Sequence, residues 1–460
     1  MRKFNKNYKM FSPCSLCRNT VAVFAAVFCL SLPASAQMPQ HDLDAKYATE
    51  LVKPGIVSPD FTLRTPQGKK LTLSKLSKGH YTVLDFWASW CPDCRRDLPN
   101  MQRMYERFAP CGVEFVGVSF DTDKDAWQRA IDKYGIRYTQ LSDLKSMRES
   151  KVAADYGAKW IPSMVLLDPD GKVVLSTVLS DKLEKTLYER IPETFEVRSV
   201  RENVSIDGHH GRLSARIQRP ELQAGEQCPM VLLCHGFGGN KEGQMFDLIA
   251  DSLCRYGIAS IRFDFNGHGE SEGEFQQMTV PNEMADAKAV FEYVRDLRYV
   301  SRVGIVGHSM GGVVASMLAG QLSEEAGEGE ASPLSSVVLL APAATLRDDC
   351  VRGTIFGQSF DPLDPPEFLP LFGGRLRLGQ DYLKTAFRLP IYETAAHYHG
   401  PAAIIHGTAD RIAPYTYGLR YHQQWQGSEY YELDGQDHGF TQNIYHAMRL
   451  ASDFLVRTLK

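Results

Sequence analysis

The chain has 460 residues, too many for one compact core, so its length predicts two domains plus processing segments. A hydrophobic content of 43% and a charged content of 23% are typical of a globular protein in water. The formal net charge of −4 gives no reason to expect nucleic acid or an anionic membrane surface as a partner.

The first 36 residues have the parts of a secretory signal peptide. A basic segment with no acidic residue is followed by an apolar run over residues 21–32 and by Ala34-Ser35-Ala36, an A-x-A cleavage pattern. Twelve mostly apolar residues are too few to span a bilayer, and no later stretch is apolar enough to do so. We therefore expect a signal peptide over residues 1–36 and a periplasmic or secreted mature protein.

Ten cysteines are present, and three of them fall in the predicted signal peptide. The seven that remain are an odd number, which argues against a disulfide scaffold. Cys228 and Cys234 stand at the two ends of one strand-like run, too far apart for a disulfide. We expect both to be buried thiols.

The most distinctive pattern of the first half is a CxxC motif between a strand and a helix. Strand-like residues 81–87 lead directly into Trp90-Cys91-Pro92-Asp93-Cys94, and residues 95–108 predict a helix. At the N-terminus of that helix the dipole and the free N–H groups stabilise a thiolate, which makes Cys91 an attacking nucleophile. Cys94, one turn further on, can then resolve a mixed disulfide.

The elements that follow alternate between strand and helix. The expected elements are a strand over 113–120, helices over 124–134 and 147–156, a strand after Ile161-Pro162, and a hairpin turn at Asp170-Gly171 before residues 173–178.

Residues 50–185 resemble the TlpA-like thioredoxin family. The resemblance rests on the Trp-Cys-x-x-Cys motif, on Asp85 and on Ile161-Pro162. It implies a redox-active pair at Cys91 and Cys94, a buried acid at Asp85, and a cis-proline at Pro162 that lies beside the cysteines. Two alternatives stay open: a zinc site, which lacks a second Cys/His pair at suitable spacing, and a redox-inert docking domain.

A second module begins after the helix-like residues 183–190, which Pro192 ends. Strand-like residues 194–198 follow. We place the boundary there, with a thioredoxin-like domain over 37–191 and a second domain over 192–460.

Six apolar runs of the second module predict the strands of a doubly wound sheet, with helices between them. These runs cover residues 230–234, 258–265, 303–306, 337–340, 402–405 and 430–433. Segments rich in Gly, His or Asp follow most of them, and ligands bind at the carboxyl ends of the strands in such sheets.

The third run ends in Gly307-His308-Ser309-Met310-Gly311, the nucleophile-elbow pattern of α/β-hydrolases. Its turn is so tight that the positions two before and two after the serine carry no side chain. A helix over 313–322 should follow, and the Glu-rich residues 323–336 predict a solvated loop. Alone the pattern is weak, because an ordinary Gly-rich turn matches it too.

A base and an acid occur in the order that this fold requires. Asp410 follows the fifth strand and His438 the sixth, so they can complete a triad with Ser309. Asp437 is a weaker acid candidate because adjacent side chains rarely face each other. Two further histidines, His235 and His268, are interpreted as loop-shaping residues. The N–H groups of Phe237 and Met310 are the expected oxyanion hole.

Residues 200–460 resemble the cinnamoyl/feruloyl esterases of the α/β-hydrolase superfamily. The matching segments are residues 235–237, 263–269, 312–320, 338–346, 389–393 and 405–408. The resemblance implies a small cap at residues 346–395 over the acyl site. It also implies substrate contacts from Asp349 and Tyr382, the positions from which relatives hydrogen-bond the phenolic hydroxyl.

Two positions depart from the family pattern. Phe356 stands where relatives carry an amide, which leaves the acyl preference open. Met310 stands where they carry glutamine, but it needs only to donate its N–H.

The sequence thus predicts an α/β fold: a thioredoxin-like domain followed by an α/β-hydrolase domain with a small cap. The expected function is an exported serine carboxylesterase acting on small-molecule hydroxycinnamate esters, with no metal or cofactor. A protein that exchanges disulfides with the first domain is a possible further partner. Alternatives are a thiol–disulfide oxidoreductase with a binding hydrolase half, and a peptidase or acyltransferase on the same triad.

Overall fold

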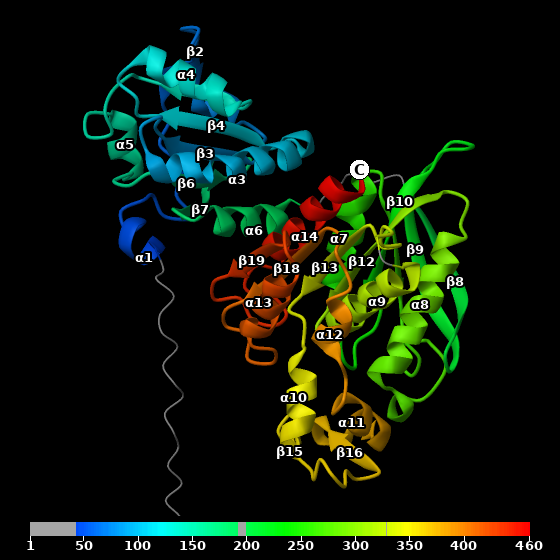
Figure 1. Ribbon diagram of the computed structural model, residues 1–460. Coiled ribbons are helices and arrows are strands. Elements are labelled where there is room, and N and C mark those ends of the chain that lie inside the picture. Colours follow the sequence, from blue (N-terminus) through cyan, green and yellow to red (C-terminus); the bar gives the residue numbers. More distant parts are fainter. Residues whose placement is uncertain (1–42, 192–198, 328) are drawn as a thin grey trace, which may run out of the picture. The chain divides into compact units, whose positions relative to one another are not determined.

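The computed structural model describes residues 43–191, 199–327 and 329–460 (Figure 1). The predicted signal peptide and the predicted strand over residues 194–198 lie outside these residues, as does the predicted domain boundary. The described residues form two large β-sheets, one of seven strands before residue 180 and one of eight strands after residue 198, and two small sheets of two strands each. No helix of the described residues is both long enough and apolar enough to cross a membrane.

The first sheet has the strand order β2-β1-β5-β4-β3-β6-β7. Its strands are β1 (Thr62–Arg64), β2 (Lys70–Thr72), β3 (Thr82–Trp87), β4 (Glu114–Ser119), β5 (Thr139–Ser142), β6 (Ser163–Leu167) and β7 (Val173–Thr177). The helices are α1 (Leu43–Tyr47), α2 (Leu73–Leu76), α3 (Pro92–Phe108), α4 (Lys124–Tyr134), α5 (Lys151–Tyr156) and α6 (Ser180–Arg190). Strand β3 is central and buried along its whole length, parallel to β4 and antiparallel to β6.

Four helix starts differ from the expectation, among them α6, which begins at Ser180 rather than residue 183, and the helix Met310–Ala326, which begins before the expected residue 313. Helix α3 begins at Pro92 rather than residue 95, because proline suits the first helical position and Cys91 caps the helix. Helix α5 begins at Lys151 rather than residue 147. Before it, Ser146 forms a turn, and its carbonyl accepts from the N–H groups of Glu149 and Ser150.

The second sheet has the strand order β19-β18-β13-β12-β10-β11-β9-β8. Its strands are β8 (Ser199–Gly208), β9 (Gly211–Pro220), β10 (Cys228–Cys234), β11 (Ala259–Phe263), β12 (Val300–His308), β13 (Ser336–Leu340), β18 (Ala402–Gly407) and β19 (Glu429–Leu433). The six predicted strands are all present and parallel, and the β8–β9 hairpin adds an antiparallel edge. Their carboxyl ends therefore lie at one edge.

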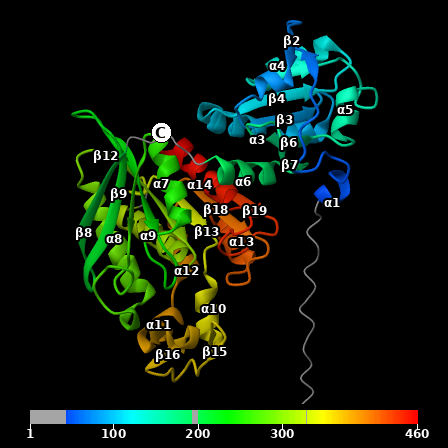
Figure 2. The ribbon, with the colours of Figure 1, turned by 180° about the vertical axis from the view of Figure 1, so that it is seen from behind.

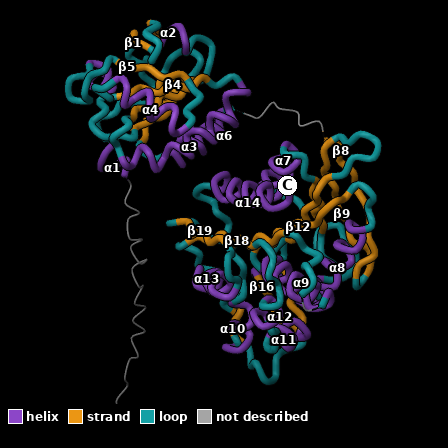
Figure 3. The backbone as a smooth tube through the Cα atoms, turned by 45° about the horizontal axis from the view of Figure 1, so that its top comes forward, coloured by secondary structure: helices purple, strands orange, loops and turns teal. Residues whose placement is uncertain are grey.

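Helices cover both faces of this sheet (Figures 2 and 3). One face packs on α7 (Gln244–Arg255) and α14 (Ile444–Leu459), and the other on α8 (Val280–Arg295), α9 (Met310–Ala326) and α13 (Tyr415–Gln424). Successive strand residues point to opposite faces, so Leu232 and Leu233 belong to different cores. With both faces buried, the parallel strands need continuous apolar runs.

Residues 345–395 form the cap beyond one end of the sheet (Figure 1). It consists of α10 (Thr345–Arg352), β14 (Thr354–Ile355), β15 (Gln358–Ser359), β16 (Phe368–Leu371), β17 (Leu376–Gly379), α11 (Gln380–Ala386) and α12 (Ile391–Ala395). The loop predicted from residue 323 is shorter than expected, because α9 continues to Ala326. Lys288 anchors its last turn by an ion pair of 2.7 Å to Glu325.

Candidate active sites

The CxxC motif occupies the turn from β3 into α3. Cys91 and Cys94 are joined by a disulfide with a Cα–Cα distance of 5.3 Å. The N–H of Cys94 donates to the Cys91 sulfur at 3.0 Å, so the helix start is directed at this atom. The peptide bond Ile161–Pro162 is cis, and the Ile161 carbonyl oxygen lies 3.5 Å from the Cys91 sulfur. The structure thus brings three of the four predicted redox residues together.

Asp85, the fourth, lies on β3 and is only 2% exposed. Burial raises the pKa of its carboxyl group to about 7, although the hydroxyl of Tyr138 donates a hydrogen bond to it at 2.7 Å. A carboxyl group with this pKa can hold or release a proton near neutral pH. Sequence reasoning missed Tyr138, because its contact depends on the pairing of β3, β4 and β5.

Ser309 stands at the turn from β12 into α9 with a φ of 57°, a backbone angle that residues other than glycine rarely adopt. The two glycines of the motif are required by close approach. A β-carbon on Gly307 would lie 2.1 Å from the Gly311 carbonyl oxygen, and one on Gly311 would lie 2.3 Å from that of Cys234. The turn is therefore a nucleophile elbow in geometry as well as in sequence.

The structure brings the three predicted triad residues into one hydrogen-bonded chain. The Ser309 hydroxyl lies 2.8 Å from Nε2 of His438, and Nδ1 of His438 lies 2.7 Å from Oδ2 of Asp410. The ring is thus placed to take a proton from the serine, while the carboxylate fixes its tautomer. Ser309 is 7% exposed.

Asp410 is held by more than the triad. Its Oδ1 accepts from the N–H groups of Ile412 and Ala413, both at 2.9 Å, and its Oδ2 also accepts from Nε2 of His406 at 3.1 Å. Burial alone would raise the pKa of Asp410, but the hydrogen bonds from His406 and His438 outweigh burial and hold that pKa below its usual value. The carboxylate therefore stays ionised.

His406 and His308 contact the triad residues, and sequence reasoning missed both. Nε2 of His308 donates to the backbone carbonyl of His438 at 2.9 Å, and burial lowers the pKa of His308 to about 4, so its ring is neutral. Gly418 leaves room for His406, since a β-carbon there would lie 2.4 Å from Nδ1 of that ring. Both histidines stand at strand ends on the catalytic edge. That position is the sequence signal by which they could have been found.

The three weaker candidates have structural partners. Nδ1 of His235 donates to the Gly236 carbonyl at 2.9 Å, and its Nε2 accepts from the Phe265 N–H at 3.2 Å, which ties two loops together. Nδ1 of His268 lies 3.2 Å from the Asn266 carbonyl. Asp437 accepts from the N–H and hydroxyl of Thr441. None of the three has a hydrogen bond to Ser309 or His438 in the described structure.

The predicted oxyanion residues flank the nucleophile. Met310 is the first residue of α9, and Phe237 follows Gly236, which lies so close that a β-carbon there would be 2.8 Å from the Ser309 β-carbon. Backbone N–H groups at a helix start lack intrahelical partners and suit a developing oxyanion.

The two predicted substrate contacts differ in position. Tyr382 is buried beside Met310, the residue that follows Ser309, with its hydroxyl 3.8 Å from the Met310 sulfur. Asp349 instead accepts hydrogen bonds within α10, from Arg352 at 2.6 Å and Thr345 at 3.2 Å. The structure therefore brings Tyr382 to the site and gives Asp349 partners of its own.

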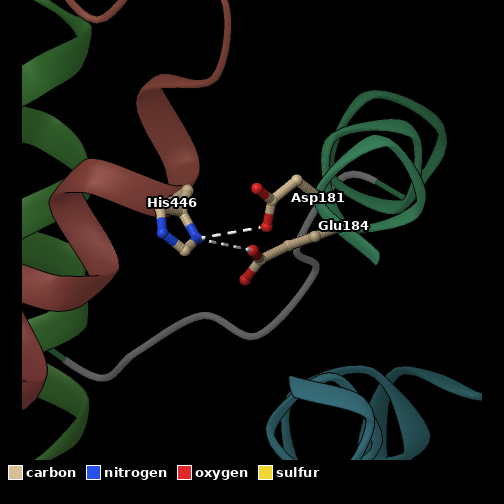
Figure 4. A group of neighbouring side chains, drawn as sticks. All are labelled: Asp181, Glu184 and His446. Atoms are coloured by element: carbon tan, nitrogen blue, oxygen red, sulfur yellow. Dashed lines mark ion pairs between the residues drawn. The ribbon is translucent and has the colours of Figure 1, made fainter. Parts of the chain in front are cut away.

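One group of three possible metal ligands occurs among the described residues: Asp181 and Glu184 on α6, and His446 on α14 (Figure 4). Arg449 donates to Glu184 at 2.9 Å and to Nδ1 of His446 at 2.9 Å. A guanidinium that already occupies these acceptors disfavours a cation. We interpret the group as an ion-pair network.

Comparisons with known proteins divide the chain at the same place as the two sheets. The sequence model of the AhpC/TSA family matches residues 54–176, and the model described as serine aminopeptidase, S33, matches residues 225–359. Thiol-disulfide oxidoreductase ResA of Bacillus thuringiensis (strain Al Hakam) is 31% identical over 27% of this chain and 69% of its own, and that of Bacillus subtilis (strain 168) is 33% identical over 27% and 67%.

The second half is similar to solved structures of Est1E from Butyrivibrio proteoclasticus. The structure with ferulic acid bound has a TM-score of 0.51 and 25% identity over 55% of this chain and 98% of its own. The other has a TM-score of 0.50 and 23% identity over 56% and 98%, and it supports the fold alone.

Proposed function

Because the chain belongs to the AhpC/TSA family of thioredoxin-like proteins through its first domain and continues into an α/β-hydrolase domain, we propose that it is an exported serine carboxylesterase fused to a thiol–disulfide exchange module. The observation that carries the esterase is the chain of hydrogen bonds from Ser309 through His438 to Asp410. The disulfide between Cys91 and Cys94 at a helix N-terminus supports the second activity.

In the proposed reaction the Ser309 oxygen attacks the ester carbonyl while Nε2 of His438 takes the hydroxyl proton. The N–H groups of Phe237 and Met310 stabilise the oxyanion, and His438 returns the proton to the departing alcohol. Water, activated by the same histidine, then releases the acid from the acyl-enzyme. Asp410 stays ionised throughout and stabilises the imidazolium.

The proposed substrates are hydroxycinnamate esters of plant-derived carbohydrate. Two observations support an aromatic acyl group. The rings of Phe275 and Tyr382 lie 5.4 and 5.9 Å from that of Phe237, so the surroundings of the nucleophile are aromatic. The similar Est1E structure holds ferulic acid. The hydroxyl of Tyr382 is the candidate partner for a polar group on the acyl ring.

The test is hydrolysis of methyl ferulate by the wild-type protein and by Ser309→Ala. We expect a loss of activity of at least about 10⁴-fold, the usual effect of removing a triad nucleophile. Ser316→Ala, which removes a buried serine of the same helix, is the matched control and should keep activity. Hydrolysis that persists in Ser309→Ala would overturn the assignment.

A second candidate is a peptidase on the same triad, favoured by the description of the sequence model that matches residues 225–359. Amino-acyl p-nitroanilides separate the two reactions, because a peptidase cleaves their amide bond and an esterase leaves it intact. A third candidate is an oxidoreductase whose hydrolase half only binds, favoured by the intact CxxC pair. Reduction of insulin disulfides by a protein inactive on every ester would support it.

A further inference from the structure

Phe356 occupies a turn position that suits other residues better. It forms with Gly357 the two-residue loop between β14 and β15, with φ values of 47° and 77°. Positive φ at both central residues is the pattern of a type I′ turn, for which Asn-Gly is the favoured sequence. A bulky aromatic residue there opposes the local preference, and such conflicts concentrate at functional sites.

Phe372 repeats this conflict elsewhere in the cap. It follows β16 with a φ of 51° and precedes two glycines that also have positive φ. Six residues other than glycine have positive φ in the described chain: Leu144, Ser309, Ala341, Phe356, Phe372 and Phe440. One of them is the nucleophile and another follows His438 by two positions, so strained backbone gathers around the catalytic edge.

The two strained rings extend the aromatic surroundings of the nucleophile outward. Phe356 lies 5.0 Å from the ring of Phe237 and 5.2 Å from that of Phe372. Phe356 is 43% exposed and Phe372 is 54% exposed, whereas Tyr382, which also contacts Phe237, is buried. The row of rings thus runs from a buried end at Tyr382 to an exposed end at Phe372.

We propose that Phe356 and Phe372 form an aromatic platform that binds the sugar ring of the ester's alcohol portion. This inference rests on the proposed esterase function. The apolar acyl ring gains most from the buried end of the row, where Tyr382 lies, and the alcohol remains in water because it is part of a carbohydrate. The platform is continuous with Phe237, so a molecule that stacks on it is within reach of the nucleophile.

The chemistry of the cap fits a sugar better than a fully apolar group. A sugar ring has a face of C–H groups, which stacks on an aromatic ring, and an edge of hydroxyl groups. Exposed polar side chains stand close to the platform in sequence, Gln358 two residues after Phe356 and Arg375 three after Phe372. Polar groups of this kind suit the hydroxyl edge of a sugar, and the aromatic rings suit its C–H face.

The experiment compares methyl ferulate with a feruloylated arabinose ester, which share the acyl group. The variants are Phe356→Asn and Phe372→Asn, because asparagine tolerates positive φ and should leave the melting temperature unchanged or higher. We expect kcat/KM on the sugar ester to fall by about tenfold or more, mainly through KM, and kcat/KM on methyl ferulate to fall by a clearly smaller factor, because its methanol portion cannot stack on the rings. Phe356→Trp should keep the preference for the sugar ester over methyl ferulate. Leu363→Asn, a change at a cap residue that is 87% exposed, should keep it too.

Equal losses on the two esters would overturn the proposal by assigning the rings to the acyl group, and so would an unchanged sugar ester. A second measurement does not need hydrolysis: retardation of the Ser309→Ala protein in native gels that contain arabinoxylan. The Phe356→Asn and Phe372→Asn changes should abolish that retardation. If the wild-type protein hydrolyses neither ester while arabinoxylan still retards it through these rings, the esterase assignment fails and the platform stands.

Discussion

Both domains place a reactive side chain at a turn between a strand and a helix. Each presents its proposed nucleophile where a central strand turns into a helix, β3 into α3 for Cys91 and β12 into α9 for Ser309. The backbone angle φ has opposite signs at the two positions. Cys91 has a φ of −77°, an ordinary extended value, whereas Ser309 has a φ of 57°. Only the serine turn needs glycines on both sides.

The difference follows from the acidity of the two groups. A thiol has an ordinary pKa of about 8.5, so a helix N-terminus alone can bring its thiolate within reach of neutral pH. A serine hydroxyl stays protonated and needs a base in direct contact. The hydrolase therefore contributes His438 and Asp410 from two further strand ends. In the thioredoxin-like domain the buried acid Asp85 has no hydrogen bond to the cysteines in the described structure.

The largest expected effect tests the need for an ionised acid. In Asp410→Asn the partner of His438 can no longer stabilise the imidazolium, and kcat on methyl ferulate should fall by about 10⁴-fold. Asp437→Asn changes the adjacent acid, and its kcat should fall by less than about tenfold. The Asp437 carboxylate accepts hydrogen bonds only from its own loop. Equal losses in the two variants would remove the distinction between these acids.

The next effect concerns the buried acid of the other domain. The folded pKa of Asp85 is raised from 3.8 to about 7, so the folded protein holds an extra proton between these values. Stability of the domain therefore falls as pH rises from about 4 to 7. Asp85→Asn should remove this loss and stabilise the domain at pH 8 by up to about 4 kcal/mol.

The measurement is chemical denaturation of the protein at pH 4 and pH 8. At pH 4 the carboxyl group is protonated in the folded state, so most of the gain should be absent. A stabilisation of the same size at both pH values would contradict burial as the cause of the raised pKa.

A smaller effect tests the second donor to the triad acid. His406→Leu removes the hydrogen bond to Asp410 while it keeps an apolar volume, and should lower kcat about 10- to 100-fold, the cost of about 1–3 kcal/mol for a lost buried partner. KM should stay close to that of wild type. His406→Gln can place a donor near the former Nε2 and should recover part of the rate, which a purely structural role does not explain.

The smallest expected effect is on coupling between the two nucleophiles. Replacement of both cysteines, Cys91→Ser with Cys94→Ser, should abolish reduction of insulin disulfides and leave kcat/KM on methyl ferulate within about twofold of wild type. The triad contains no thiol, so its chemistry does not depend on the redox state. A large change in esterase rate would show that the two sites are coupled.

Much of the fold and of both sites could be predicted because the signals are local. The apolar runs identified the six parallel strands, since strands buried on both faces need continuous hydrophobicity. The elbow could be read from Gly307 and Gly311, because backbone packing excludes any β-carbon there. The redox pair could be read from a CxxC motif between a predicted strand and a predicted helix.

The sequence by itself therefore determined that the chain carries two candidate nucleophiles and where each one stands. Only the tertiary structure decided what surrounds them, because those partners lie far away along the chain. It selected Asp410 over Asp437, added His406 and His308, and aligned Phe237 with Phe356 and Phe372. Local turn chemistry fixes a nucleophile within a few residues, whereas a base, an acid and a binding surface meet only when distant strand ends share one edge.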